Sequence, residues 1–442
     1  MLNNEQLKLC TLDLGGNERV FVIFAAAPIK INLLNQSLKA IFQISEFRNF
    51  LLGRFIFIMG LRMMGTLVAW WMYELTGDAF YIGMIGLAEA IPAVGLSLYA
   101  GYTVDKSDKR QLLVKCIFLF GICAFTLLAT STQWFHQSFG NKLIIICVYA
   151  IIFFTGVIRA FSGPTFGAII ASLVPKDKLI TAAQLSSTSW LVASIAGHAL
   201  GGFLIALLHV TGTFIVITCF IFLGLSFIFR LKSKPPGVSG EKKTLDAVTE
   251  GLKYVFKTKE LLAALSLDLF AVLFGGAVAM VPVYAKDILN VGPIGFGWLN
   301  AACDIGSIIM VGWLTLSPMK KRQGIKLLFA VAGFGACIII FGLSKWYWLS
   351  FGALLVSGIL DGVSMVVRGN IVQLKTPDEL RGRVMSVNSM FINSSNEIGQ
   401  FESGVAAKLM GIVPSVVFGG CMTIMIVVAT WFKAPSLKKL EY

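Results

Sequence analysis

Nine ionisable side chains lie within long apolar stretches of this 442-residue chain. They are Arg62, Glu89, Arg159, Asp268, Asp304, Asp361, Arg368, Glu397 and Glu402. A charged group at membrane depth costs roughly 3 kcal/mol on insertion scales, unless it has a partner or faces water. These positions are therefore where proton binding is expected. Each also has a structural interpretation, either as a buried ion pair or as a long side chain whose charged end reaches the membrane surface.

Four of these residues are the first candidates for proton coupling. When the chain is aligned with itself so that Arg159 lies on Asp361, these opposite charges fall at equivalent depths of two related halves. The acid could then bind a proton, and the base could favour the ionised form of the acid. A purely structural role for this pair is the alternative. Asp304 is flanked by small residues, which let a partner helix or water approach. Glu89 precedes Pro92 by three residues and would face the cavity from the first half.

Two further residues have competing interpretations. Asp268, the fifth proton-coupling candidate, lies about two turns into its apolar stretch. A salt bridge that gates or packs the helices explains Asp268 at least as well as proton binding does. His198 titrates near neutral pH in principle, but a single His among small residues is more often a hydrogen-bonded packing residue.

The composition requires membrane-spanning elements to carry these residues. Hydrophobic residues make up 57% and charged residues 14% of the chain, and the mean hydropathy is +0.81. This leaves too little polar surface for a soluble protein of this length. The formal net charge is +14, yet Lys and Arg are divided among alternate connections, which argues against a nucleic-acid partner. The eight Cys are scattered without ligand-spaced His, and they predict no disulfide, metal or cofactor site.

Hydropathy predicts an all-α membrane protein with twelve transmembrane helices in two six-helix pseudo-repeats. The predicted helices span 52–74, 79–101, 112–131, 143–171, 187–209, 212–232, 260–285, 293–316, 325–344, 347–373, 383–410 and 412–433. A long connection with an amphipathic stretch from Thr244 to Lys257 follows the sixth helix. The predicted organisation is an N-terminal extension over 1–48, a six-helix half over 49–232, a linker over 233–259, a second half over 260–433 and a tail over 434–442.

Internal similarity supports the two halves. The register that aligns Arg159 with Asp361 also aligns a proline and several glycines. The aligned pairs are Pro175 with Pro377, Gly156 with Gly358, Gly167 with Gly369, Gly197 with Gly399 and Gly202 with Gly404. A second register places Gly312 opposite Gly101.

The distribution of Lys and Arg predicts the orientation. These residues accumulate in the connections on one side of the predicted helices, whereas the other side holds Lys142, Lys286, Lys345 and Lys408. Positive residues favour the cytoplasmic side, so both termini are expected in the cytoplasm.

A charged connection follows the second predicted helix, and it reads GYTVDKSDKR over 101–110. Its charges alone describe an ordinary cytoplasmic loop, but its spacing resembles the loop motif of the major facilitator superfamily, G-x3-D-[RK]-x-G-[RK]-[RK]. Asp108 stands where that motif has Gly, so a side chain is expected to cap the turn. The resemblance implies a cytoplasmic gate made of Gly101, Asp105, Lys106, Lys109 and Arg110.

From Phe47 to about Phe432 the chain resembles a twelve-span major facilitator, in the branch that contains the enterobactin exporter and related multidrug efflux proteins. Besides the loop motif, the residues that carry this resemblance are 268–275, 282–293, 381–385 and 399–404. The fifth predicted helix departs from the antiporter pattern G-P-x-x-G-G. It contains Gly197, His198, Gly201 and Gly202 as its packing motif, so a titratable ring replaces the proline bend.

The resemblance implies a secondary transporter of the bacterial inner membrane that works by alternating access. The expected activity is proton-coupled export of an amphipathic small molecule, such as a drug or siderophore, by a monomer in the lipid bilayer. The candidates for lining the substrate path are Arg62, Trp70, Trp190 and Phe274, since aromatic surfaces suit such molecules. A proton-coupled importer of a siderophore or nutrient, and a ligand sensor on the same fold, are the alternatives. An enzyme is not expected, because no nucleophile–base pair, metal set or nucleotide loop has usable spacing.

Overall fold

The structure is a computed structural model that describes residues 40–234, 244–317, 319, 321–438 and 440. Every regular element in this part of the chain is helical. The predicted extension over 1–48 is described only from residue 40 onward, and positions 235–243 of the predicted linker lie outside the described residues.

The helices follow the apolar stretches, because a helix satisfies its backbone hydrogen bonds within one segment, as a bilayer demands. The first half contains α2 (Ser45–Thr76), α3 (Ala79–Gly95), α4 (Ser97–Lys106), α5 (Lys109–Thr130), α6 (Gln133–Ile170), the short η2 (Lys176–Lys178) and α7 (Leu179–Phe229). The second half contains α9 (Lys259–Phe274), η3 (Ala277–Met280), α10 (Val281–Val283), the π-helix η4 (Tyr284–Ile288), α11 (Gly292–Leu316), α12 (Gln323–Leu343), α13 (Tyr347–Lys375), α14 (Asp378–Met410) and α15 (Ile412–Lys433). The predicted amphipathic stretch is helix α8 (Thr244–Lys257), and α16 (Pro435–Lys438) ends the described chain.

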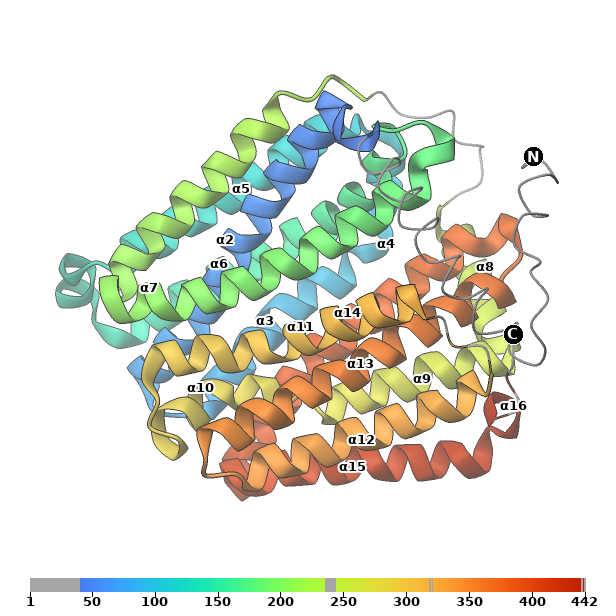
Figure 1. Ribbon diagram of the computed structural model, residues 1–442. Coiled ribbons are helices and arrows are strands. Elements are labelled where there is room, and N and C mark those ends of the chain that lie inside the picture. Colours follow the sequence, from blue (N-terminus) through green and yellow to red (C-terminus); the bar gives the residue numbers. More distant parts are fainter. Residues whose placement is uncertain (1–39, 235–243, 318, 320, 439, 441–442) are drawn as a thin grey trace, which may run out of the picture.

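Nine helices of the described residues are long and apolar enough to cross a membrane by length and composition alone. Helix α7 contains two predicted spans, because the chain reverses at His209, where φ is 55° (Figure 1). Helix α3 is shorter and ends soon after Pro92, and α4 continues the same predicted span. Helix α14 coincides with the polar eleventh span. The predicted all-α membrane fold is confirmed, and each of the twelve predicted stretches falls on a described helix.

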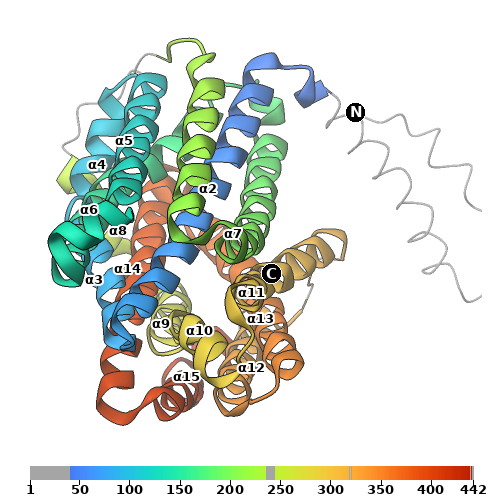
Figure 2. The same cartoon turned by 90° about the vertical axis from the view of Figure 1, so that its left-hand side faces the viewer.

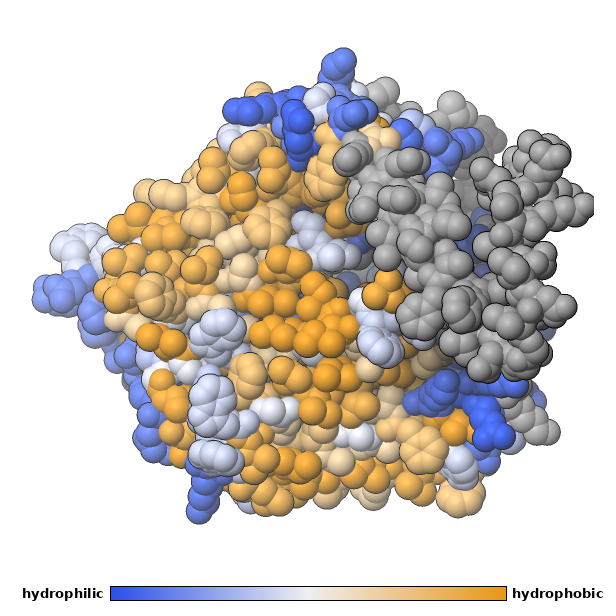
Figure 3. All heavy atoms as spheres, viewed as in Figure 1, coloured by the Kyte–Doolittle hydropathy of each residue, from blue (hydrophilic) through white to orange (hydrophobic). Residues whose placement is uncertain are grey.

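The helices form two groups that lie side by side with their long axes roughly aligned (Figures 1 and 2). Apolar residues cover the broad middle of the visible surface, and hydrophilic residues gather toward the helix ends (Figure 3). Such an apolar band is the surface that a bilayer covers. We call the end of the bundle with α8 and α16 the linker end, and the opposite end, where α7 turns at His209, the reversal end.

Glycines bring the two halves into close contact toward the reversal end. The principal pairs of helices that join the halves are α3 with α14 and α7 with α11. A Cβ added to Gly83 on α3 would lie 2.8 Å from Gly404 Cα on α14, and one added to Gly202 on α7 would lie 2.8 Å from Gly297 Cα on α11. A side chain at any of these positions would push the backbones apart.

Four glycines toward the linker end differ. A Cβ added to Gly101 on α4, Gly167 on α6, Gly312 on α11 or Gly369 on α13 would meet no heavy atom within 4 Å. These are the positions that the two sequence registers pair with each other. The halves are therefore tightly joined toward one end, and the equivalent glycines at the other end have free space beside them.

Candidate functional site

A charge cluster joins the two halves in the interior of the bundle. Arg159 on α6 donates from Nη1 to Glu89 Oε1 on α3 at 2.7 Å and to Glu397 Oε1 on α14 at 2.6 Å. Glycines make the approach possible, since a Cβ on Gly156 would lie 2.5 Å from the Glu89 carbonyl oxygen and one on Gly86 would lie 2.6 Å from that of Glu397. One guanidinium thus bridges a carboxylate of each half.

A second polar cluster lies where α7 meets α11. Ser194 donates to Asp304 Oδ2, and His198 Nε2 lies 3.9 Å from the same oxygen. On its other side, His198 Nδ1 lies 2.8 Å from the hydroxyl oxygen of Thr66 on α2. This cluster also spans both halves, because Ser194, His198 and Thr66 belong to the first half and Asp304 to the second.

Arg62 connects the two clusters. Its guanidinium lies over the ring of Trp190 at 4.7 Å from the centroid, which is the geometry of a cation–π contact. Arg62 interacts electrostatically with Asp304, and also with Glu89, Arg159 and Glu397. Two cations and several carboxylates therefore share one region of low polarity, where charge balance is strongly favoured.

Asp361 on α13 is a partly exposed carboxylate that interacts electrostatically with Asp304. The sequence paired Asp361 with Arg159 across the cavity. In the structure Arg159 instead binds Glu89 and Glu397, and Asp361 has no salt bridge among the described residues. The expected Arg159–Asp361 pair is not formed in this conformation, because the nearer carboxylates of α3 and α14 occupy the guanidinium.

Asp268 forms a salt bridge with Arg368 inside the second half. The pair joins α9 to α13, and both residues are buried, with 7% and 6% of their surfaces exposed. Ser364 on α13 lies 3.5 Å from the other carboxylate oxygen of Asp268. Of the two interpretations of Asp268, the structure has the helix-packing salt bridge.

The predicted substrate-lining residues are divided among different surroundings. Trp190 is partly exposed beside Arg62, but Trp70 is 6% exposed and packs on Phe296 of the second half at 5.5 Å between ring centroids. The carbonyl of Phe274 lies against Gly419 on α15. Only Arg62 and Trp190 of this predicted set are brought together.

The predicted gate motif makes its hydrogen bonds within the first half and to the start of the linker. Arg110 donates to the Phe229 carbonyl oxygen at 2.7 Å, Lys106 contacts the Tyr102 hydroxyl, and the Lys109 amide donates to the Lys234 carbonyl oxygen at 3.1 Å. The side chain of Asp105 lies outside the described residues.

The predicted side-chain cap of this turn is confirmed. The carboxylate of Asp108 accepts from the Gln111 amide at 2.9 Å and caps the N-terminus of α5. It also accepts from the Ser233 hydroxyl and from the Lys234 amide. Partial burial by itself raises the pKa of Asp108, but these hydrogen bonds outweigh burial, and its pKa lies below the ordinary value.

The fifth-helix motif packs on two helices at once. Gly197 faces α2, where a Cβ would lie 2.6 Å from Arg62 Cβ, and Gly201 lies against Met63 of the same helix. Gly202 faces α11 of the second half. Close packing is therefore retained without the proline of the family pattern, and His198 lies between the two contacts.

Sequence reasoning missed the hydroxyl partners Thr66 and Ser194. Each stands four residues from an ionisable residue of its own helix, Thr66 from Arg62 and Ser194 from His198, so the pairs share a helix face. Polar residues at this spacing within an apolar stretch are the signal that would have found them.

A third contact between the halves closes the reversal end. Tyr73 at the end of α2 donates to the carboxylate of Asp287 in η4, and the ammonium of Lys286 lies 5.5 Å from the centroid of the Tyr73 ring. The π-helical turn of η4 presents these neighbouring charges.

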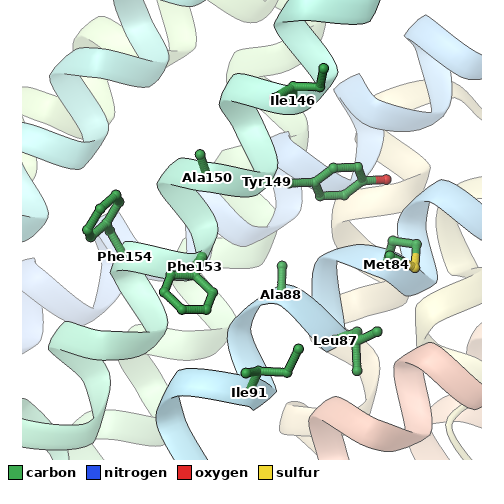
Figure 4. A pocket seen from close by; sticks show the side chains of 9 residues that line it. All are labelled: Met84, Leu87, Ala88, Ile91, Ile146, Tyr149, Ala150, Phe153 and Phe154. Atoms are coloured by element: carbon green, nitrogen blue, oxygen red, sulfur yellow. The ribbon is translucent and has the colours of Figure 1, made fainter.

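An apolar groove of about 520 Å³ lies between α3 and α6. Aromatic side chains of α6 face aliphatic ones of α3 across it (Figure 4). Ile91 and Ile146 are more than half exposed, and Tyr149 donates its hydroxyl to the Tyr81 carbonyl oxygen at 2.9 Å. The groove therefore offers a hydrocarbon surface, and the ionisable clusters lie elsewhere.

Within the described ranges no group of three or more His, Cys, Asp or Glu side chains is placed to hold a metal ion.

Solved structures share this architecture. A POT family transporter in complex with 5-aminolevulinic acid superposes with a TM-score of 0.71 at 12% identity, covering 89% of this chain and 96% of that one. A D-xylose-proton symporter has a TM-score of 0.66 at 13% identity, covering 92% and 100%. A bacterial homolog to the human lysosomal transporter Spinster, in an inward-facing and unoccupied conformation, has a TM-score of 0.64 at 14% identity, covering 89% and 97%.

Sequence relatives point to one branch of transporters. The enterobactin exporter EntS of Shigella boydii is 22% identical over 346 residues, which cover 76% of this chain and 79% of that protein. EntS of Escherichia coli has the same identity and coverage. The family model of the Major Facilitator Superfamily matches residues 50–400. This match covers most of the chain, so the protein belongs to the Major Facilitator Superfamily and is a multi-span membrane transporter.

Proposed function

We propose that this transporter exports an amphipathic small molecule of the siderophore or drug class across the bacterial inner membrane in exchange for protons. The observation that carries the proposal is the bridge from Arg159 to Glu89 and Glu397. It joins the two halves through ionisable groups, so any movement that separates the halves must break these contacts and change the charge balance. A proton that binds a carboxylate can compensate for the lost partner.

Alternating access explains the difference between the two ends of the bundle. The halves are in contact at Tyr73 and Asp287 and at the glycine pairs Gly83–Gly404 and Gly202–Gly297 toward the reversal end, whereas Gly101, Gly167, Gly312 and Gly369 toward the linker end have free space beside them. The distribution of Lys and Arg favours a cytoplasmic location for the linker end and both termini. The conformation is then inward-facing, with rigid halves over 49–232 and 260–433. The stretch from Gly101 to Arg110 would close against the second half when the linker end shuts.

Three considerations support this direction and substrate class. The sequence relatives are enterobactin exporters by name. Arg62 and Trp190 offer a cation and an aromatic face together, which suits an amphipathic or anionic organic molecule. The ionisable groups at the interface, including Asp304, Asp361 and Glu89, supply sites that a proton gradient can load.

The test is flux in proteoliposomes of known orientation with an imposed pH gradient, using iron-free enterobactin and an amphipathic dye as probes. Movement of a probe against the direction of the protons would establish antiport and support export. Movement with the protons would overturn export in favour of a symporter that imports its substrate. Saturable binding without gradient-driven movement of either probe would overturn transport in favour of a ligand sensor.

A further inference from the structure

The hydrogen bonds around His198 determine where its protons lie. The Thr66 hydroxyl stands four residues after Arg62 on α2 and lies 2.9 Å from the Arg62 carbonyl oxygen, the usual acceptor for a threonine within a helix. A hydroxyl has one proton, so once it is donated to this carbonyl, the Thr66 oxygen can only accept from His198 Nδ1 at 2.8 Å. Nδ1 therefore carries a proton, and in the neutral ring Nε2 does not.

Nε2 faces Asp304 Oδ2 across the interface between the halves, at 3.9 Å. An unprotonated ring nitrogen and an ionised carboxylate both present lone pairs, so this arrangement is repulsive unless an additional proton is present. Ser194 donates to the same carboxylate oxygen, but its proton does not point at the ring. The two atoms are too far apart for a hydrogen bond, but an additional proton on Nε2 would turn the repulsion into a salt bridge between an imidazolium and a carboxylate.

Several charged and titratable groups surround this pair. Arg62 reaches this region from α2, Arg159 from α6 and Asp361 from α13, and α11 contributes Cys303 beside Asp304. Helix α5 packs on the later part of α7, at Phe222. Four carboxylates, those of Glu89, Glu397, Asp304 and Asp361, stand against the two arginines. Glu89 and Glu397 already bind Arg159, which leaves Arg62 alone to balance the carboxylates of Asp304 and Asp361.

We propose that His198 Nε2 carries one additional proton and pairs as an imidazolium with the Asp304 carboxylate, and that this proton is the one the transporter exchanges for its substrate. The protonated pair attracts α7 to α11, where the His198 carbonyl oxygen would be only 2.6 Å from a Cβ on Gly297. Loss of the proton makes the pair repulsive and leaves Asp304 to Arg62. The contact between the halves thereby depends on protonation. The exchange rests on the proposed function, but the location of the proton does not.

The location can be tested without transport, because the chain has three His. The protein labelled with 15N-histidine in lipid nanodiscs should give one ring with both nitrogens protonated. His198→Gln assigns this ring, and Asp304→Asn should move its Nε2 signal to that of a bare nitrogen. A neutral ring would overturn the proposal, and a bare Nδ1 in that ring would show in addition that Thr66 donates to His198.

The exchange is tested by flux in the same variants. His198→Gln and Asp304→Asn should each lose the flux driven by a pH gradient but keep counterflow of substrate, which needs no net proton movement. The exposed His136→Gln is the matched control and should behave as the wild type. Gradient-driven flux retained in both site variants would overturn the coupling role. If the wild type moves neither probe, the proposed transport fails while the NMR result still decides where the proton lies.

Discussion

Two groups of ion pairs within the bundle have similar chemistry and different positions. Asp268 and Arg368 bind each other within the second half, between α9 and α13. Arg159 instead binds Glu89 of its own half and Glu397 of the other half. A pair within a rigid body stabilises that body, whereas a bridge between two bodies stabilises one arrangement of them. The first should govern folding, and the second should govern the conformational change.

Arg368→Ala should have the largest effect on stability. It leaves Asp268 buried and unpaired, and breaking a buried pair costs about 3–5 kcal/mol. The free energy of unfolding in detergent should fall accordingly, while folded protein should retain the direction of proton-driven flux. The control is the double variant Asp268→Leu with Arg368→Leu, which removes both charges and should regain most of the stability. A single variant as stable as the wild type would contradict a structural role for the pair.

Arg159→Ala should destabilise the protein less and impair transport more. The Arg159 side chain is 39% exposed, so solvent can partly replace it, and we expect a loss of about 1–3 kcal/mol. Proton-driven flux should be abolished, because the carboxylates of the two halves would repel each other. Arg159→Lys retains a charge that can contact both acids and should recover part of the flux. Equal losses of flux in Arg159→Ala and Arg368→Ala would remove the distinction between the two groups.

A pair of glycine variants compares the two ends of the interface. Gly297→Ala places a Cβ 2.6 Å from the His198 carbonyl oxygen, whereas Gly369→Ala places one in free space. Overpacking costs about 1–3 kcal/mol, so Gly297→Ala should shift the population toward a separated reversal end. Distances between spin labels on the reversal-end tips of α3 and α14, in a cysteine-free background, report this shift. Similar distributions in the two variants would mean that the glycines do not hold this end closed.

The fold could be predicted from the sequence because its signals are local. These signals are the long apolar stretches, their Gly and Pro interruptions and the amphipathic stretch of the linker. The turn at Asp108 was accessible for the same reason. The partners of the buried charges were not. The repeat register pairs residues at equivalent positions, but contacts across an interface depend on the relative placement of the halves, which no local pattern encodes. Arg159 therefore contacts Glu397, a residue that the sequence offered only as one of nine buried charges.

The contact between His198 and Asp304 likewise could not be predicted from the sequence. The sequence singled out both residues, His198 in the fifth-helix motif and Asp304 as a proton site, but nothing in it placed them together. Their contact depends on the close approach of α7 and α11 at Gly202 and Gly297. Small residues at matching depths of two helices indicate that a close approach is possible, and the pairing itself has to come from the structure.

Asp108→Ala should have the smallest effect, because this residue belongs to a surface turn and not to the interface. Loss of a helix N-cap costs about 1 kcal/mol. The pKa of Asp108 lies below its ordinary value, so its carboxylate contributes stability above that value and loses it as the pH falls toward the lowered pKa. Asp108→Asn keeps a capping oxygen without the charge, so it should remain nearly as stable at neutral pH and lose this part of the acid dependence. Unfolding of the three proteins between neutral and acidic pH measures the difference. If Asp108→Asn lost stability in acid as steeply as the wild type, the acid dependence would belong to other groups. Asp108 would then stabilise the turn only as an uncharged helix cap.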